Sequence, residues 1–186
     1  MNRLLLLLGP SGVGKSTIIN ELCNLDNRFI YISPYITRKL RDGENNKISI
    51  GDKEMEEMSK RGEFLCVNEI YNTRYGTPKF PIIKSFEEGN FPVLDWPAEK
   101  IGIMEKVFSG RLYVVYMIPP SIDELKKRLS KDSRDPDGVR LKSAIKELIE
   151  FESGRLDNVY DLKIISRTNC VAETAQMIYK NYIGNK

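Results

Sequence analysis

Apolar residues in this chain gather into short continuous runs, separated by segments with helical spacing. The first run is five consecutive leucines at 4–8, bounded by a glycine, which predicts a strand buried on both faces. Further strands are predicted where β-branched and aromatic residues cluster, at 29–33, 91–95, 112–118 and 162–165. Because helical stretches separate these runs, the order predicts an α/β fold with a mostly parallel central sheet between layers of helices.

The intervening segments carry apolar residues at helical spacing. Ile18, Ile19 and Leu22 predict a helix over about 14–24 that packs back on the first strand. Ser121 and Glu124 form a capping box that opens a helix to about 129. Further helices are expected over 141–149 and 171–182, and the polar, turn-rich segment 131–138 between two of them predicts a surface loop.

Length and composition narrow the function classes. The 186 residues suit one domain, and 29 basic against 26 acidic residues give a net charge of only +3, which argues against a nucleic-acid partner. The chain has no histidine, which excludes imidazole general bases and histidine-ligated metals. Cys23, Cys66 and Cys170 lack metal or disulfide spacing, so a reducing, cytoplasmic setting is expected. No apolar run is long enough for a signal peptide core or a membrane span, so no membrane partner is expected.

One motif carries recognisable chemistry. Residues 9–16 match Gly-x4-Gly-Lys-Ser between a predicted buried strand and a helix, which is the context of a phosphate-binding P-loop. The backbone N–H groups and the helix N-terminus favour a triphosphate, and we expect ATP with Mg²⁺. Lys15 would contact the β- and γ-phosphates, the Ser16 hydroxyl would coordinate Mg²⁺ and Thr17 could reach the α-phosphate. The expected nucleotide-binding residues are Gly9, Ser11, Gly12, Val13, Gly14, Lys15, Ser16 and Thr17.

Residues 37–44 read Thr-Arg-Lys-Leu-Arg-Asp-Gly-Glu, which resembles the Thr-Arg-x-x-Arg-x-Gly-Glu motif of guanylate kinases. Further features extend the resemblance in family order, at 62–65, 75–77, 94–95, 119–121, 125–129, 140–147 and 160–161. The resemblance covers the chain from Leu4 to about Ser166. It implies a single domain of P-loop NTPase three-layer fold, with a core over about 1–33 and 91–186, an acceptor-binding insertion over about 34–90 and a lid over about 128–140.

The resemblance also implies roles for individual residues. In the family, two arginines and a tyrosine hold the phosphate of the acceptor, and paired guanidinium groups suit a phosphate dianion. The residues implied on the acceptor side are Arg38, Arg41, Glu44, Tyr75 and Thr77. Asp95 would hold the water shell of the metal or orient the acceptor, unless it is a turn aspartate. Arg134 and Arg140 would clamp the transferring phosphoryl group, while Lys126, Lys127 and Lys142 suit a solvated surface.

The chain departs from the family where guanine is recognised. Cys66 stands where the family has a glutamate, and a cysteine cannot replace a carboxylate that accepts two hydrogen bonds. Pro34 replaces a serine near guanine O6, Pro97 replaces the second aspartate of Asp-x-Asp, and a loop tyrosine is missing from the shortened segment 45–51. Of the expected base contacts only Thr77 clearly survives. We therefore predict the loss of guanine selectivity.

The prediction that follows is an ATP- and Mg²⁺-dependent transfer of the γ-phosphoryl group to a small phosphate-bearing acceptor, such as a nucleoside monophosphate. A phosphate dianion is already nucleophilic, so no general base is required. Kinases of ribose 1,5-bisphosphate are similar and are an alternative, although they generally lack the counterpart of Arg41. A non-catalytic guanylate kinase-like binding module would typically lack a working Lys15 and Ser16, and a P-loop switch would need a water-positioning residue that we cannot identify. A monomer or a homodimer is expected.

Overall fold

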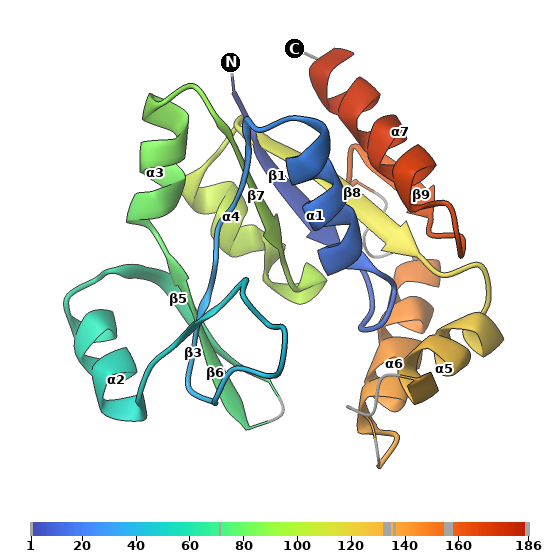
Figure 1. Ribbon diagram of the computed structural model, residues 1–186, viewed down its shortest axis with the longest axis horizontal. Coiled ribbons are helices and arrows are strands. Elements are labelled where there is room, and N and C mark those ends of the chain that lie inside the picture. The colour runs from blue at the N-terminus through green and yellow to red at the C-terminus, as the bar shows by residue number, and fades with distance from the viewer. Residues whose placement is uncertain (1, 71, 132–134, 136, 155–157, 185–186) are drawn as a thin grey trace.

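A five-stranded parallel sheet forms the centre of the molecule (Figure 1). The computed structural model describes residues 2–70, 72–131, 135, 137–154 and 158–184. The strand order is β2-β7-β1-β8-β9, formed by Phe29–Tyr31, Phe91–Asp95, Leu4–Leu8, Leu112–Ile118 and Leu162–Ile165. The predicted α/β fold with a mostly parallel sheet is confirmed. The second predicted strand is shorter than expected, because β2 ends at Tyr31 and Pro34 has no N–H to extend the pairing.

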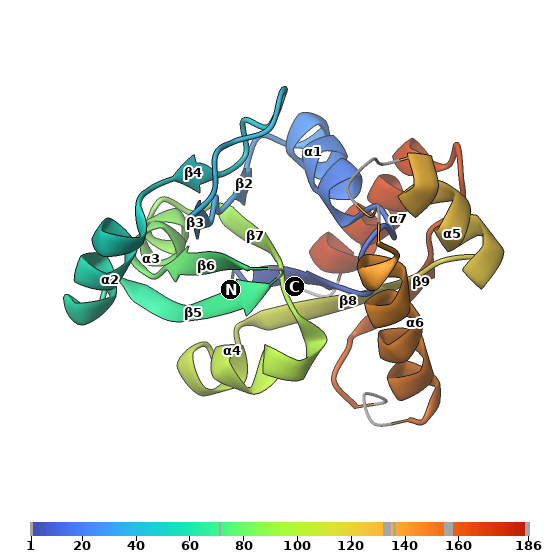
Figure 2. The same cartoon turned by 90° about the horizontal axis from the view of Figure 1, so that it is seen from below.

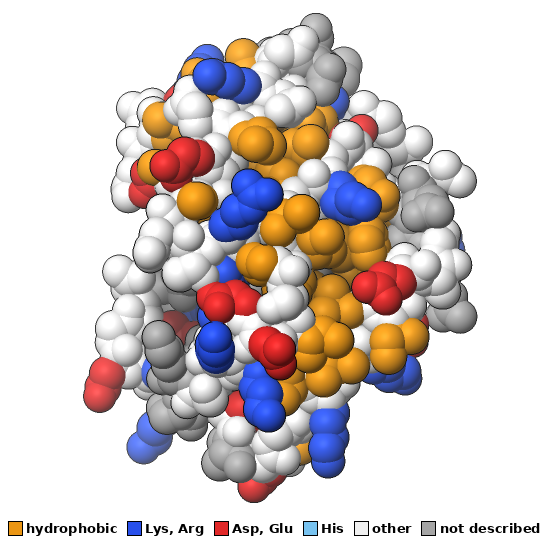
Figure 3. All heavy atoms as spheres, turned by 90° about the vertical axis from the view of Figure 1, so that its right-hand side faces the viewer, with side chains coloured by type: hydrophobic (Ala, Val, Ile, Leu, Met, Phe, Trp, Pro, Cys, Tyr) orange, Lys and Arg blue, Asp and Glu red, His pale blue; other side chains and the backbone are white. Residues whose placement is uncertain are grey.

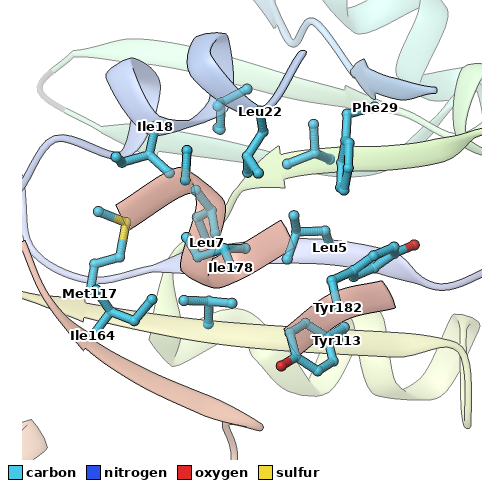
Figure 4. Close-up of a cluster of buried hydrophobic side chains, with 14 of the residues drawn as sticks. Leu5, Leu7, Ile18, Leu22, Phe29, Tyr113, Met117, Ile164, Ile178 and Tyr182 are labelled. Carbon is cyan, nitrogen blue, oxygen red and sulfur yellow. The ribbon is translucent and has the colours of Figure 1, made fainter. Parts of the chain in front are cut away.

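The leucine run is buried on both faces of this sheet. Leu5 and Leu7 face α1 (Lys15–Leu25) and α7 (Val171–Gly184) in the cluster drawn in Figure 4. That cluster also contains Ile18, Leu22, Phe29, Tyr113, Met117, Ile164, Ile178 and Tyr182. Side chains alternate along a strand, so a run without polar residues needs apolar partners on both sides.

The opposite face of the sheet has its own apolar cluster. Leu4, Leu6 and Leu8 pack there with Met104 of α4 (Ile101–Val107), Ile82 of α3 (Phe80–Glu87) and Trp96 after β7. All five leucines have no exposed surface. Because β1 is fixed from both sides, the loop that follows it starts from a rigid strand end.

Residues 34–90 contain a second, smaller sheet beside the central one (Figure 2). Its order is β4-β3-β6-β5, formed by Ile48–Ser49, Tyr35–Ile36, Thr73–Pro78 and Phe64–Ile70. Helix α2 (Asp52–Lys60) buries Met55 and Met58 against it. The apolar pattern predicted no strand here, because two of the strands have only two residues and the other two lack regular alternation.

Helices α5 (Ile122–Lys131) and α6 (Val139–Glu152) lie on the other side of the core from α2 (Figures 1 and 2). The Glu124 N–H donates to the Ser121 hydroxyl at 3.1 Å, so the predicted cap at Ser121 is confirmed. The segment expected to form a lid, 128–140, is helical at both ends, because α5 continues to Lys131 and α6 begins at Val139. Residues 132–134 and 136 lie outside the described part of the chain.

The side of the molecule formed by α5, α6, β9 and α7 carries a broad band of hydrophobic side chains (Figure 3). Exposed apolar residues on these elements include Ile122, Ile149, Ile165 and Met177. Among the described residues, no helix combines the length and the apolar character needed to cross a bilayer.

Candidate active site

The predicted phosphate-binding loop connects β1 to α1. Gly9 has a φ of +126°, and a Cβ at this position would lie 2.2 Å from the carbonyl oxygen of Met117 in β8. Gly12 has a φ of +83°, and its Cβ would lie 2.8 Å from the Leu129 side chain of α5. Both positions require glycine, because the loop passes between a strand and a helix. The loop thereby leads to the N-terminus of α1, whose first N–H groups suit a phosphate.

Lys15 is enclosed at the start of α1. Its ammonium donates to the carbonyl oxygens of Gly9 and, at 3.1 Å, of Pro10. Burial lowers the pKa of Lys15, and the carboxylates of Glu147 and Asp95 partly oppose that shift. The structure thus brings together a lysine from the loop, an aspartate from the end of β7 and a glutamate from α6. Ser16 and Thr17, the next predicted nucleotide contacts, are exposed on the first turn of α1.

Glu147 was not among the predicted site residues. The Tyr116 hydroxyl lies 3.4 Å from Glu147 Oε1, in position to donate a hydrogen bond, and burial raises the pKa values of both Glu147 and Tyr116. One signal in the sequence could have identified it. Glu147 lies beside Ala144, Leu148 and Phe151, which form the buried side of α6, so a carboxylate there is expected to face the interior.

Arg140, predicted to clamp the transferring phosphoryl group, lies against the phosphate-binding loop. Its guanidinium Nη2 donates to the Ser11 hydroxyl at 2.6 Å. The backbone N–H groups of Arg140 and Leu141 donate to the Asp135 carboxylate at 2.8 and 3.0 Å, which fixes the start of α6. Arg134, the other predicted clamp, lies outside the described residues.

Arg128 of α5 has a role that the sequence did not predict. Its guanidinium donates to the carbonyl oxygens of Val13, at 3.2 Å, and Ser166, at 2.8 Å. The Ser166 hydroxyl also donates to the Val13 carbonyl at 2.7 Å. Arg128 therefore ties the phosphate-binding loop to the segment after β9. Its contact with Val13 joins residues 115 positions apart, so no local pattern could reveal it.

Arg38 and Glu44 form a two-point ion pair in the insertion. Arg38 Nη1 and Nη2 donate to the two Glu44 carboxylate oxygens at 2.7 and 2.8 Å. Glu44 also accepts the Arg41 N–H at 3.2 Å and lies 3.3 Å from the Lys47 ammonium. Tyr75 interacts with Arg38, whereas the Arg41 side chain is exposed. Glu44 thus orients Arg38, and Arg41 stays open toward solvent.

The ion pair makes Glu44 a source of acid sensitivity. Arg38, followed by the Arg41 N–H and Lys47, lowers the pKa of Glu44 from its ordinary 4.5 to about 2. Because the pKa is lower in the folded state, the stabilisation is complete above pH 4.5 and is lost as the pH falls toward 2. We expect Glu44→Gln to be less stable than the wild type at pH 7, with a difference that shrinks between pH 4.5 and 2.

Urea unfolding midpoints measured from about pH 7 to about pH 2 test this expectation. Glu57→Gln, which changes an exposed carboxylate on α2, is the matched control and should differ little from the wild type throughout. A difference for Glu44→Gln that stays constant over the whole range would contradict the assigned ion pair.

Asp95 ends β7 beside the phosphate-binding loop. The Tyr31 hydroxyl donates to Asp95 Oδ1 at 2.9 Å, and burial together with Asp95 raises the pKa of Tyr31. Mg²⁺ in phosphate-transfer sites usually takes one or two protein oxygens and completes its shell with phosphates and water. Ser16 and Asp95 are oxygen ligands of this kind, and the field of Asp95 reaches Lys15, so the residues present fit a magnesium nucleotide.

The resemblance aligns Cys66, Thr77 and Pro97 with positions of the family that contact guanine or carry the second aspartate. Cys66 pairs with Thr77 across β5 and β6, and Thr77 is buried. Pro97, which the resemblance aligns with the second aspartate of the family, immediately precedes a short 3-10 helix. Two surface pockets of about 330 Å³ border this region at Tyr35 and Pro78, and neither includes a residue of the phosphate-binding loop.

Comparisons with known proteins agree with this geometry. A family model described as guanylate kinase matches residues 1–174. The chain is 29% identical to the guanylate kinase of Malacoplasma penetrans, over 99% of this chain and 96% of that one. It is 31% identical to the guanylate kinase of Rickettsia prowazekii, over 88% of this chain and 82% of that one.

Two solved structures share the fold. The guanylate kinase of Anaplasma phagocytophilum superposes with a TM-score of 0.76 at 21% identity, over 99% of this chain and 86% of that one. The shikimate kinase of Acinetobacter baumannii superposes with a TM-score of 0.55 at 17% identity, over 100% of this chain and 96% of that one. Both superpositions cover nearly the whole chain, so the chain shares the P-loop kinase fold of these structures.

Proposed function

Because the chain belongs to the guanylate kinase family, whose members carry out ATP-dependent phosphoryl transfer, we propose that it phosphorylates a small phosphate-bearing acceptor, such as a nucleoside monophosphate, without selectivity for GMP. One contrast carries the proposal. Three cationic side chains support phosphate binding, with Lys15 and Arg140 at the loop and Arg38 in the insertion. The carboxylate expected to read guanine is replaced by Cys66.

The proposed mechanism consists of positioning and charge neutralisation. Arg38, oriented by Glu44, and the exposed Arg41 hold the phosphate of the acceptor. Lys15 exchanges the carbonyl oxygens of Gly9 and Pro10 for phosphate oxygens of ATP, and Arg140 reaches the transferring group from α6. Mg²⁺ held by Ser16 and Asp95 would neutralise charge on the phosphates.

Attack on the γ-phosphorus comes from an oxygen of the acceptor phosphate, with ADP as the leaving group. That oxygen is already ionised at neutral pH, so the chain needs no titrating base. This agrees with a sequence that has no histidine. The role of the protein is to align the two phosphates and to offset their repulsion, which requires cations and backbone N–H groups.

ADP release with a panel of acceptors tests the proposal. We expect GMP to be used no better than AMP, UMP or CMP within about tenfold, because loss of a charged hydrogen-bond acceptor costs about 1.5 to 3 kcal/mol. A strong preference for GMP over the other nucleotides would contradict it.

Arg38→Ala should raise the KM for the acceptor about 10- to 100-fold and leave the KM for ATP nearly unchanged, because it removes a charged hydrogen bond only to the acceptor. Initial rates with one substrate varied at a time give both constants. Lys53→Ala, on the exposed surface of α2, is the control and should change neither constant. Equal effects of Arg38→Ala on both substrates would exclude the acceptor-side role.

A further inference from the structure

Several polar side chains beside Tyr75 take no part in the phosphate contacts described above. In the antiparallel pair β5 and β6, Cys66 lies opposite Thr77 and Asn68 lies opposite Tyr75. Residues directly opposite each other, and residues two apart along one strand, project from the same face of a sheet. These four side chains therefore share the face that adjoins Arg38, where the acceptor phosphate is expected.

Lys100 reaches the same place from the core. It ends the 3-10 helix η1 (Ala98–Lys100) after β7, and its ammonium donates a hydrogen bond to Asn68 Oδ1. The Cys66 thiol lies 3.7 Å from the same oxygen. An ammonium group can only donate, so the Asn68 amide must present its oxygen to Lys100 and its NH₂ group elsewhere. We call Cys66, Asn68, Thr77 and Lys100 the donor cluster.

The donor cluster is held firmly and lies partly within the protein. Asn68 and Thr77 are each 5% exposed, whereas Cys66 and Lys100 are half-buried. Burial raises the pKa of Cys66 in spite of the nearby Lys100 charge, so the side chain remains a thiol at neutral pH. A thiol is a weak donor and a poor acceptor.

The hydrogen bonds still available to a ligand are therefore mainly donors. They are the remaining N–H groups of Lys100 and the NH₂ group of Asn68, whereas the Thr77 hydroxyl interacts with Cys66 and can both donate and accept. None of the four members is a carboxylate. Guanine presents two donors, N1–H and the 2-amino group, and only one acceptor, O6, on the corresponding edge. Two of its three groups would face donors, which is unfavourable in a site with little water.

We propose that the donor cluster selects an acceptor molecule whose far end presents oxygen atoms as hydrogen-bond acceptors, with Lys100 and Asn68 as the residues that determine specificity. This inference rests on the proposed phosphotransfer function. Two sources supply such oxygens, the carbonyl groups of a pyrimidine base and a second phosphate group. Lys100 can neutralise the charge of the second source, and both sources can accept from the Asn68 amide.

The test compares kcat/KM of the wild type and Lys100→Met in the ADP-release assay, with UMP, CMP, ribose 1,5-bisphosphate, AMP and GMP as acceptors. We expect either the pyrimidine nucleotides UMP and CMP or ribose 1,5-bisphosphate to be preferred over GMP and AMP. A preference for the pyrimidine nucleotides would identify base carbonyl groups as the source of oxygen, and a preference for ribose 1,5-bisphosphate would identify a second phosphate. Lys100→Met should lower kcat/KM for the preferred acceptor roughly 10- to 100-fold, the size of one charged hydrogen bond. The KM for ATP should stay unchanged.

Two further variants complete the design. Lys106→Met removes an exposed lysine of the neighbouring α4 and should behave as the wild type. Asn68→Asp keeps a partner for Lys100 but replaces the NH₂ donors with an oxygen. Asn68→Asp should lower kcat/KM for the preferred acceptor and raise the relative rate with GMP. If Lys100→Met does not fold, Asn68→Asp alone tests the donor cluster.

The possible outcomes distinguish the proposed function from the donor cluster. A wild-type protein that transfers phosphate to none of these acceptors would overturn the proposed function, and with it this inference. Transfer in which GMP is used as well as the other acceptors, within about tenfold, would overturn the assignment of the donor cluster alone, whereas a strong preference for GMP would overturn both. An unchanged order of preference in folded Lys100→Met and Asn68→Asp would likewise overturn the assignment of the donor cluster alone.

Discussion

Lys15→Ala is expected to lower kcat of phosphoryl transfer about 100- to 1,000-fold, the usual effect of removing one preorganised group that stabilises charge in the transition state. The half-buried lysine donates to the loop carbonyls of Gly9 and Pro10, and the charges of Glu147 and Asp95 act on it. A bound triphosphate would therefore meet this ammonium directly at the β- and γ-phosphates. Steady-state ADP release with saturating acceptor measures the loss.

The fold should tolerate this change, because burial already disfavours the charge of Lys15. A melting temperature within a few degrees of the wild type is expected, and a preserved circular dichroism spectrum would exclude unfolding as the cause of inactivity. Lys142→Ala, on the exposed side of α6, is the matched control and should keep full activity. Activity of Lys15→Ala close to that of the wild type would refute the P-loop assignment.

Gly9→Ala is expected to destabilise the protein by about 3 kcal/mol or more, and to abolish nucleotide binding in whatever fraction folds. The added Cβ would lie 2.2 Å from the Met117 carbonyl oxygen, which belongs to the backbone of β8 in the central sheet and cannot rotate away. The φ of +126° adds strain for any residue with a Cβ. Unfolding in urea, followed by fluorescence of the single tryptophan, Trp96, gives the free energy of unfolding.

Gly110→Ala is the control that separates the cost of backbone strain from the cost of a steric clash. Gly110 has a φ of +68°, and no heavy atom lies within 4 Å of the place that an added Cβ would take, so only the strain remains. A cost of about 1 kcal/mol is expected there. Equal losses of stability in the two variants would show that the close approach of the loop to β8 is not what requires glycine at position 9.

The central sheet could be predicted because its strands are continuous apolar runs. A strand buried on both faces needs apolar residues at every position, and the leucines 4–8 meet that requirement within five residues. The phosphate-binding loop could be predicted for a similar reason, since its glycines and lysine are contiguous. The small sheet of the insertion escaped prediction, because β3 and β4 are held mainly by their neighbours rather than by a pattern of their own.

The residues of the proposed site follow the same division. Arg38 and Glu44 are six positions apart, so their proximity is a local consequence of the loop. Glu147 faces Lys15 only because α6 packs against the carboxyl end of the sheet. The hydrogen bond between Lys100 and Asn68 likewise requires the insertion and the core to meet at one point.

The sequence by itself determined the parallel sheet and the phosphate-binding loop, because each depends on residues that are adjacent or fall in one repeating pattern. Only the tertiary structure decided which buried charges surround Lys15, how Arg128 anchors the loop and which donors gather beside Cys66. The physical reason is that hydrogen bonds and charge pairs act over a few ångströms in space. Folding alone brings distant residues within that range.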